Sequence, residues 1–141
     1  MNTLKKGDSL PNFECLNDKG NLVKSNDYKG KKLIVFFYPR ANTPGCTAEA
    51  CNLSENFDDL TKKGYSILGI SCDKVETQSK FSNKFSLKYP LLADTDKNLV
   101  KLFGVWGPKK FMGREYEGIH RMTFIFDENS VVSRVIEKVN T

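Results

Sequence analysis

The stretch LIVFFYPRANTPGC, residues 33–46, decides the fold. Its first six residues form an unbroken β-branched and aromatic run, which is typical of a central strand buried on both faces. Pro39 cannot donate to a strand ladder, so the strand is expected to end before it. Thr43 then fits the N-cap of a helix, and Pro44 fits its first position. The stretch predicts a strand and a helix joined by a short loop, with Cys46 in the first turn of the helix.

The predicted helix has one apolar face. Its apolar residues and its first cysteine recur at spacings of 4, 3, 4 and 3, and they are Cys46, Ala50, Leu53, Phe57 and Leu60. This spacing keeps the five side chains within about 40° of one helical face. The helix is expected to end near Gly64.

The rest of the chain continues the alternation of strands and helices. The expected elements are a hairpin of strands 13–16 and 21–24, a strand 65–72, a helix 74–85, a short helix 96–103, and a second hairpin of strands 122–126 and 131–136. Strand, helix, strand, helix and hairpin is the order of the thioredoxin fold, an α/β fold with a central mixed sheet flanked by helices. We expect residues 1–141 to form one such domain, with the first hairpin as an N-terminal extension.

Composition limits the class of protein. With 39% hydrophobic and 28% charged residues, the 141-residue chain can bury a core and keep a solvated surface. The net charge of +5 comes from scattered lysines, which form doublets but no longer basic run. A nucleic-acid interface needs basic residues gathered on one face, so no nucleic-acid partner is expected. The sequence shows neither a signal peptide nor the roughly 20 apolar residues of a membrane span, so we expect no membrane association and a cytoplasmic location.

Cys46 occupies a position that favours an anion. The first N–H groups of a helix lack intrahelical partners, and the helix dipole is positive at that end. The thiolate is the nucleophilic form of cysteine, and helix N-termini or nearby cations lower a cysteine pKa below its free value of about 8.5. The alternative is a buried structural cysteine, since free cysteine is among the most buried residue types.

The residues around Cys46 favour the catalytic alternative. PRANTPGC, residues 39–46, resembles the peroxiredoxin signature: a proline, three residues, a threonine or serine, two residues, and the peroxidatic cysteine. In that pattern Pro39 shields the pocket, the Thr43 hydroxyl bonds a peroxide oxygen, and Gly45, beside Pro44, lets substrate approach backbone N–H groups. The resemblance implies that Cys46 is the peroxidatic residue.

Two further segments extend the resemblance. TAEAC, residues 47–51, resembles the Q-type subgroup, also called bacterioferritin comigratory protein, and implies that Cys51 is the resolving cysteine in the same helix. GIHRMTF, residues 118–124, resembles the family segment whose arginine opens a late strand beside the cysteine. Arg121 cannot be deprotonated, so it can hold the thiolate and polarise the peroxide.

The resemblance implies a thiol peroxidase that acts on hydrogen peroxide and organic hydroperoxides. The Cys46 thiolate attacks one peroxide oxygen and becomes a sulfenic acid, while fixed donors stabilise the departing oxygen. An intramolecular disulfide with Cys51 resolves the sulfenic acid, and thioredoxin or a similar dithiol protein reduces the disulfide. This chemistry needs no metal and no organic cofactor. Resolution within one chain and the resemblance to Q-type proteins favour a monomer.

Other classes of function remain open. A thiol–disulfide oxidoreductase would share the fold, but its usual Cys-x-x-Cys motif is missing. A non-enzymatic redox sensor could use the same sulfenic acid. A cysteine hydrolase would need His120, the only histidine, within about 3 Å of Cys46. A zinc site could draw on Cys46, Cys51, Cys72 and His120, but it would lack the second close ligand pair of common structural sites.

The other cysteines and two departures from the family complete the expectations. Cys15 and Cys72 match no family cysteine, so we expect both to be spectators. Gln78 stands where many relatives have histidine, a difference expected to alter the rim of the pocket. The sequence ends at Thr141, where relatives continue into a further helix.

Overall fold

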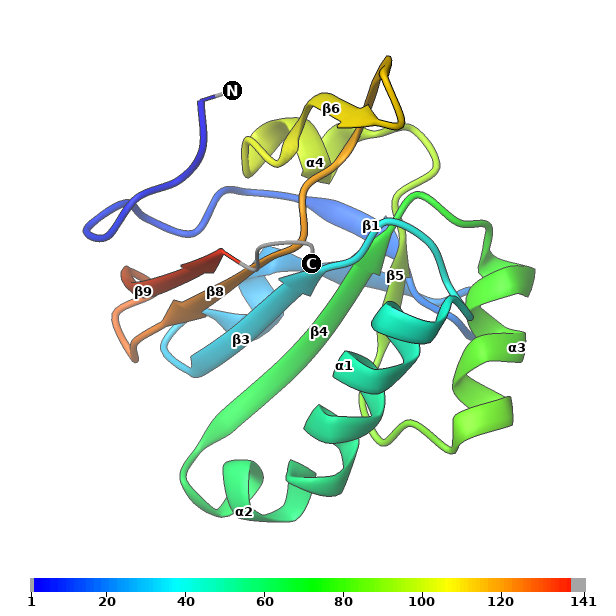
Figure 1. The fold of residues 1–141 in the computed structure, drawn as a ribbon. Coiled ribbons are helices and arrows are strands. Elements are labelled where there is room, and N and C mark those ends of the chain that lie inside the picture. The colour runs from blue at the N-terminus through cyan, green and yellow to red at the C-terminus, as the bar shows by residue number, and fades with distance from the viewer. Residues whose placement is uncertain (1, 138–141) are drawn as a thin grey trace.

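The computed structural model describes residues 2–137, and a five-stranded mixed sheet lies at its centre (Figure 1). In their order across the sheet, the strands are β5 (Leu91–Ala93), β4 (Tyr65–Ser71), β3 (Lys32–Phe37), β8 (Met122–Phe126) and β9 (Val132–Glu137). β3 pairs parallel with β4 and antiparallel with β8. β5 extends the parallel side and β9 the antiparallel side. The predicted central mixed sheet is confirmed.

β3 is the buried central strand that the sequence predicts. It begins at Lys32, one residue before the predicted start, and ends at Phe37. Residues 33–37 are buried because layers of structure cover both faces of the sheet. Tyr38 lies just beyond the strand, yet its N–H still donates to the Ile70 carbonyl of β4 at 3.0 Å. The chain therefore leaves the sheet at Pro39, as predicted.

Helices cover both faces of the sheet. Those on one face, where Ile34 and Phe36 point, are α1 (Pro44–Glu55), α2 (Phe57–Lys62) and α3 (Val75–Phe85) (Figure 1). α4 (Asn98–Leu102) lies on the other face, where Leu33 and Val35 point. Alternate side chains of a strand point to opposite faces, so β3 contributes to two cores. α1 packs its predicted apolar face into the first of them.

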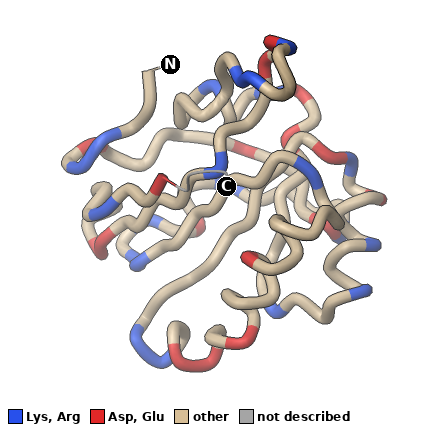
Figure 2. The backbone as a smooth tube through the Cα atoms, in the orientation of Figure 1, with Lys and Arg blue, Asp and Glu red and all other residues tan. Residues whose placement is uncertain are grey.

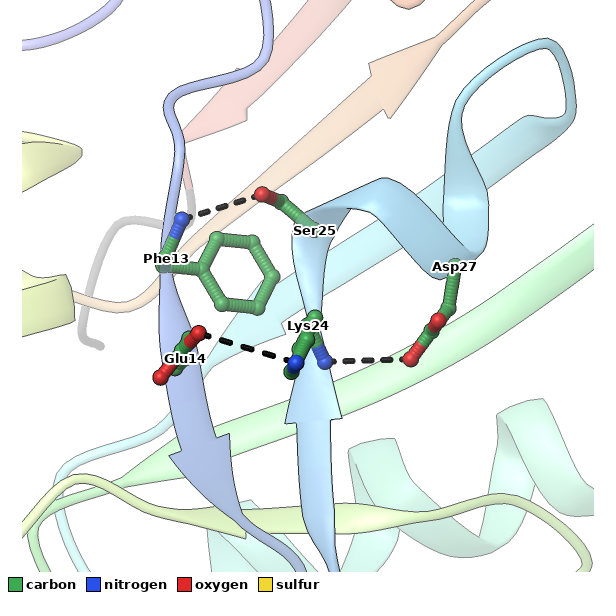
Figure 3. Close-up of polar contacts among 5 residues, drawn as sticks. All are labelled: Phe13, Glu14, Lys24, Ser25 and Asp27. Carbon is green, nitrogen blue, oxygen red and sulfur yellow. Dashed lines mark hydrogen bonds and ion pairs between the residues drawn. The ribbon is translucent and has the colours of Figure 1, made fainter.

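The N-terminal segment closes the core on the α4 side. Its elements are β1 (Glu14–Leu16), β2 (Leu22–Lys24) and the 3-10 helix η1 (Ser25–Tyr28). The Phe13 N–H donates to Ser25 Oγ at 3.0 Å, and the Lys24 N–H donates to Asp27 Oδ2 at 3.1 Å (Figure 3). These bonds hold the buried Phe13 ring against Phe103, with 6.4 Å between ring centroids. The predicted first hairpin is thus present.

The helix that carries Cys46 is interrupted, contrary to the prediction of one helix to Gly64. α1 ends at Glu55, and α2 begins at Phe57. Between them Asn56 has φ −93° and ψ 6°, and its side-chain amide donates to the Asn52 carbonyl at 2.8 Å. The Asn56 N–H reaches the same Asn52 carbonyl at 3.2 Å, so backbone and side chain share one acceptor where φ and ψ leave the helical region.

Three strands escaped the sequence analysis. β5 has only three residues, and β6 (Trp106–Phe111) and β7 (Arg114–Ile119) form a hairpin outside the main sheet. The sequences of β6 and β7 are largely polar and lack the alternation that marks a half-buried strand, whereas β5 is apolar but very short. One signal was available: the two-residue loop contains Gly113, and both of its residues have positive φ, as a primed hairpin turn requires.

Charged residues are distributed over many elements. Figure 2 shows lysines and arginines scattered along the chain rather than gathered on one element. Within residues 2–137, every helix is too short or too polar to cross a bilayer.

Candidate active site

Cys46 lies in the first turn of α1, with no exposed surface. Its neighbours in the core on this face of the sheet include Tyr38, Ala41 and Ala50. The first helical bond of this end runs from the Thr47 N–H to the Thr43 carbonyl at 2.8 Å. The amides before Thr47 belong to the end of the helix that attracts anions, so the thiol lies where a negative charge is stabilised.

The loop before α1 places the signature residues around Cys46. Pro39 is half-buried, whereas Pro44 and Gly45 are exposed and leave the helix end open to solvent. Thr43 is the N-cap residue, as predicted. Its Oγ1 donates to the Arg40 carbonyl at 3.0 Å, so the hydroxyl oxygen keeps lone pairs to accept a further bond.

Arg121 approaches the start of α1 from the segment that precedes β8, the strand paired with β3. The residue immediately precedes β8, whose Met122 pairs with Phe37 at the end of β3. A Cβ added to Gly45 would lie 3.3 Å from Nη2 of Arg121 and 3.5 Å from Nη1. The guanidinium therefore covers the residue next to Cys46. The sheet register thus joins Arg121 to the signature loop, although 75 residues separate Cys46 from it in the sequence.

A buried carboxylate accompanies the arginine. Glu49 Oε2 lies 4.0 Å from Arg121 Nη1, and the two side chains are 6% and 15% exposed. A partly desolvated ion pair of this kind holds a guanidinium in one place more firmly than a surface pair does. Glu49 sits one turn after Cys46 on α1, so the same helix presents both the thiol and the group that orients the cation.

Lys109 of β6 is a second cation that the sequence analysis missed. Its Nζ donates to the Ile119 carbonyl at 2.8 Å, two residues before Arg121. Burial lowers the pKa of Lys109, the charge of Arg121 lowers it further, and Cys46 acts in the opposite direction. Lys109 therefore lies within electrostatic reach of both groups. Nothing in the sequence marked it, since its position depends on the β6–β7 hairpin.

Cys51 lies on the same helix but in another environment. It is half-buried, and it forms no disulfide in this structure. It is near Tyr89, whose hydroxyl donates to the Ala50 carbonyl at 2.7 Å. Burial raises the pKa of Tyr89, and Cys51 and Glu49 add to that rise, so the tyrosine stays a neutral donor. Cys46 and Cys51 thus share α1 without facing each other.

The structure separates the remaining cysteines from this site. Cys15 lies in β1 and Cys72 follows β4, and both belong to or pack against the core on the α4 side. Burial, reinforced by the charge of Asp94, raises the pKa of each thiol to about 12. Such thiols stay protonated at neutral pH and are poor nucleophiles.

His120 and Gln78 each have a partner in the fold. His120 Nε2 contacts the Pro108 carbonyl of β6 at 3.0 Å, which gives the ring a structural partner in the hairpin. Gln78 of α3 has no exposed surface, and its expected effect on the rim of the pocket stays a prediction. Among residues 2–137, no three histidine, cysteine, aspartate or glutamate side chains are grouped as metal ligands.

The fold and this arrangement define a thioredoxin-like protein with one buried cysteine at a helix start beside an arginine. Residues 6–135 match the AhpC/TSA family, and the chain belongs to that family. Peroxiredoxin Bcp of Escherichia coli K12 is 45% identical over 141 residues, which cover 100% of this chain and 90% of the relative. A putative peroxiredoxin bcp of Haemophilus influenzae is 43% identical over 138 residues, with coverage of 98% and 89%.

Solved structures agree with the sequence relatives. A PrxQ mutant of Xylella fastidiosa has a TM-score of 0.92 at 26% identity, covering 99% of this chain and 89% of that chain. Bacterioferritin comigratory protein of Xanthomonas campestris, described for its alkyl peroxide reduction activity, has a TM-score of 0.85 at 30% identity, with coverage of 91% and 82%. The predicted thioredoxin-like fold and the resemblance to Q-type peroxiredoxins are therefore confirmed.

Proposed function

We propose that the protein is a thiol peroxidase that reduces hydrogen peroxide and alkyl hydroperoxides through a sulfenic acid on Cys46. The observation that carries this proposal is the placement of a buried cysteine at the start of α1, with the Arg121 guanidinium against Gly45. Membership of the AhpC/TSA family and the names of the relatives support it.

In the first step, the Cys46 thiolate attacks one peroxide oxygen. A sulfur–oxygen bond forms, the oxygen–oxygen bond breaks, and the departing alkoxide or hydroxide takes a proton from water to leave as alcohol or water. Arg121, the Thr43 hydroxyl and the amides of the first helical turn are the donors that meet the developing charge. Pro39 shields the sulfur from bulk water, and the exposed Pro44 and Gly45 border the way in.

In the second step, the Cys51 thiol attacks the sulfenic sulfur, water leaves, and a disulfide forms. Five residues along an α-helix place the two Cα atoms roughly 8.6 Å apart. A disulfide accepts only about 4.4 to 6.8 Å. Because both cysteines lie within α1, its first turn must open before the bond can form. Thioredoxin or a similar dithiol protein then exchanges its own thiols for the disulfide and restores both cysteines.

The proposal extends to the oligomeric state, the domain and the location of the enzyme. Resolution within one helix requires no partner subunit, so we propose a monomer. One thioredoxin-like domain comprises residues 1–141, and the cytoplasm supplies the dithiol reductant. No nucleic acid or membrane takes part.

A peroxide assay with thioredoxin, thioredoxin reductase and NADPH tests the function. The protein is expected to consume peroxide, Cys46→Ser to be inactive, and Cys51→Ser to lose the thioredoxin-dependent cycle while still gaining one oxygen atom on Cys46. Mass spectrometry after one equivalent of peroxide distinguishes the gain of oxygen from the loss of two hydrogens in the disulfide. Reduction of insulin disulfides without peroxide consumption would show a thiol–disulfide oxidoreductase instead.

A further inference from the structure

A half-buried acidic residue, Asp73, ties the signature loop to the end of β4. The Ala41 N–H donates to Asp73 Oδ2 at 2.8 Å, and the Ser71 hydroxyl donates to the same oxygen at 2.6 Å. Ser71 is fully buried and Ala41 is 7% exposed. A hydrogen bond to a carboxylate is stronger than one between neutral groups, and burial shields it from water. Asp73 therefore holds the loop that leads into α1.

Gln78 fixes the geometry of this tie from α3. Its Nε2 donates to Ser71 Oγ at 2.9 Å and to the Leu92 carbonyl of β5 at 2.8 Å. Its Oε1 accepts from the Tyr38 hydroxyl. The Leu92 carbonyl can only accept, which determines the orientation of the amide. Ser71 consequently accepts from Gln78 and has its own proton free for Asp73.

The loop between β3 and α1 makes this bond important. Asn42 has φ 62°, a left-handed conformation that an ordinary residue adopts at some cost in free energy. Thr43 follows at once, and the first turn of α1 carries Cys46 three residues later. The bond from Ala41 to Asp73 thus holds the strained segment in place and, through it, the start of α1.

We propose that Asp73 is a positioning residue that keeps the first turn of α1 closed and so controls how fast the Cys46 sulfenic acid reaches Cys51. The inference rests on the proposed roles of these two cysteines. While the turn is closed, the sulfur stays away from Cys51 and a second peroxide can oxidise it to the sulfinic acid. While the turn is open, the disulfide can form. Asp73 therefore sets the ratio of the two products.

The test compares Asp73→Ala with the wild-type protein after a rapid excess of hydrogen peroxide. The loss of one partly buried, charge-assisted bond is expected to raise the rate of disulfide formation about tenfold and to lower the sulfinic fraction correspondingly. Quenched samples analysed by mass spectrometry give both products. Asp73→Asn keeps one carbonyl oxygen for the Ala41 N–H and is expected to fall between the two.

Asp94→Ala is the matched control. Asp94 is likewise a carboxylate that accepts backbone bonds, from the Leu99 and Val100 N–H groups at 3.1 and 2.9 Å, but it is more deeply buried than Asp73 and serves α4 on the other face of the sheet. Its loss is expected to lower the melting temperature without changing the product ratio. A change of the ratio as large as that of Asp73→Ala would reduce Asp73 to a general contributor to stability and overturn the proposal.

A second variant covers the case in which Asp73→Ala does not fold. Gln78→Leu leaves Asp73 in place but removes the group that orients Ser71, so a smaller shift toward the disulfide is expected. An unchanged ratio in whichever of the two variants folds overturns the role of Asp73, whereas a wild-type protein that forms no Cys46–Cys51 disulfide overturns the proposed function itself.

Discussion

The guanidinium of Arg121 lies so close to Gly45 that a Cβ there would meet Nη2 at 3.3 Å. Gly45→Ala is therefore expected to displace the guanidinium by a few tenths of an ångström. Because oriented donors contribute to the rate through their exact placement, the second-order rate with peroxide is expected to fall about three- to tenfold. Stopped-flow measurement checks this. Ala48→Gly changes an exposed position of the same turn and serves as the control; an equal loss there would point to the helix rather than to Arg121.

Arg121→Met removes the cation that lies against Gly45, the residue next to Cys46. The peroxide rate is expected to fall at least about tenfold, since the guanidinium is proposed to stabilise the charge that develops on the departing oxygen. Arg121→Lys keeps the charge without the planar fork and is expected to recover part of the rate. An unchanged peroxide rate in Arg121→Met would contradict this role.

Lys109→Met is expected to slow the reaction with peroxide about two- to fivefold, less than the loss of Arg121, since Lys109 is partly exposed and screened. Lys109→Arg is expected to keep most of the rate. The effect is also expected to shrink at high salt. A loss that is independent of ionic strength would indicate that Lys109 acts through the Ile119 carbonyl and the hairpin instead.

Cys15 and Cys72 are expected to remain unmodified when the native protein meets an alkylating reagent. Their pKa values are raised to about 12, so the reactive thiolates appear only near or above that pH. Cys46→Ser is expected to abolish turnover, whereas Cys15→Ser and Cys72→Ser keep it. Peptide mapping after labelling at about pH 8 measures the reactivity of each thiol. Labelling of Cys72 at the rate of Cys51 would show that it is not a spectator.

Formation of the Cys46–Cys51 disulfide is expected to unwind the start of α1. The oxidised protein is expected to lose far-UV helix signal and to gain hydrogen exchange across residues 43–53, and a dithiol is expected to reverse both changes. The helix geometry is the reason, since the intact turn holds the two Cα atoms too far apart. Unchanged exchange in a chemically confirmed disulfide would contradict this account.

Local patterns predicted the part of the site that is continuous in sequence. The apolar run before Pro39 favours a buried strand, and the pair Thr43-Pro44 favours a helix start, so β3 and the start of α1 could be predicted from local sequence. Arg121 was available only through resemblance, because its place beside Gly45 depends on the pairing of β8 with β3. Neither a local pattern nor the family resemblance marked Lys109, because its position depends on the β6–β7 hairpin, whose strands lack an apolar alternation.

The dependence on contacts between distant residues also explains why the break between α1 and α2 was not predicted. The apolar spacing continues from Cys46 to Leu60 and both helices share that face, so periodicity alone could not reveal the break. The backbone of Asn56 departs from helical φ and ψ there, and its side chain bonds to the Asn52 carbonyl. The hydrogen bonds of Gln78 were not predicted either: three of them hold its amide inside the protein. Such polar networks cannot be predicted from local sequence, because their residues come from separate helices and strands.

The break at Asn56 separates the helix that carries both cysteines from α2. Unwinding that starts at Pro44 is expected to stop at the end of α1, because α2 begins separately and has its own contacts with β4. Leu60 of α2 packs against the core and is expected to stay there when the disulfide forms. After each reduction, α1 is then expected to rewind from an anchored end, without any refolding of the core.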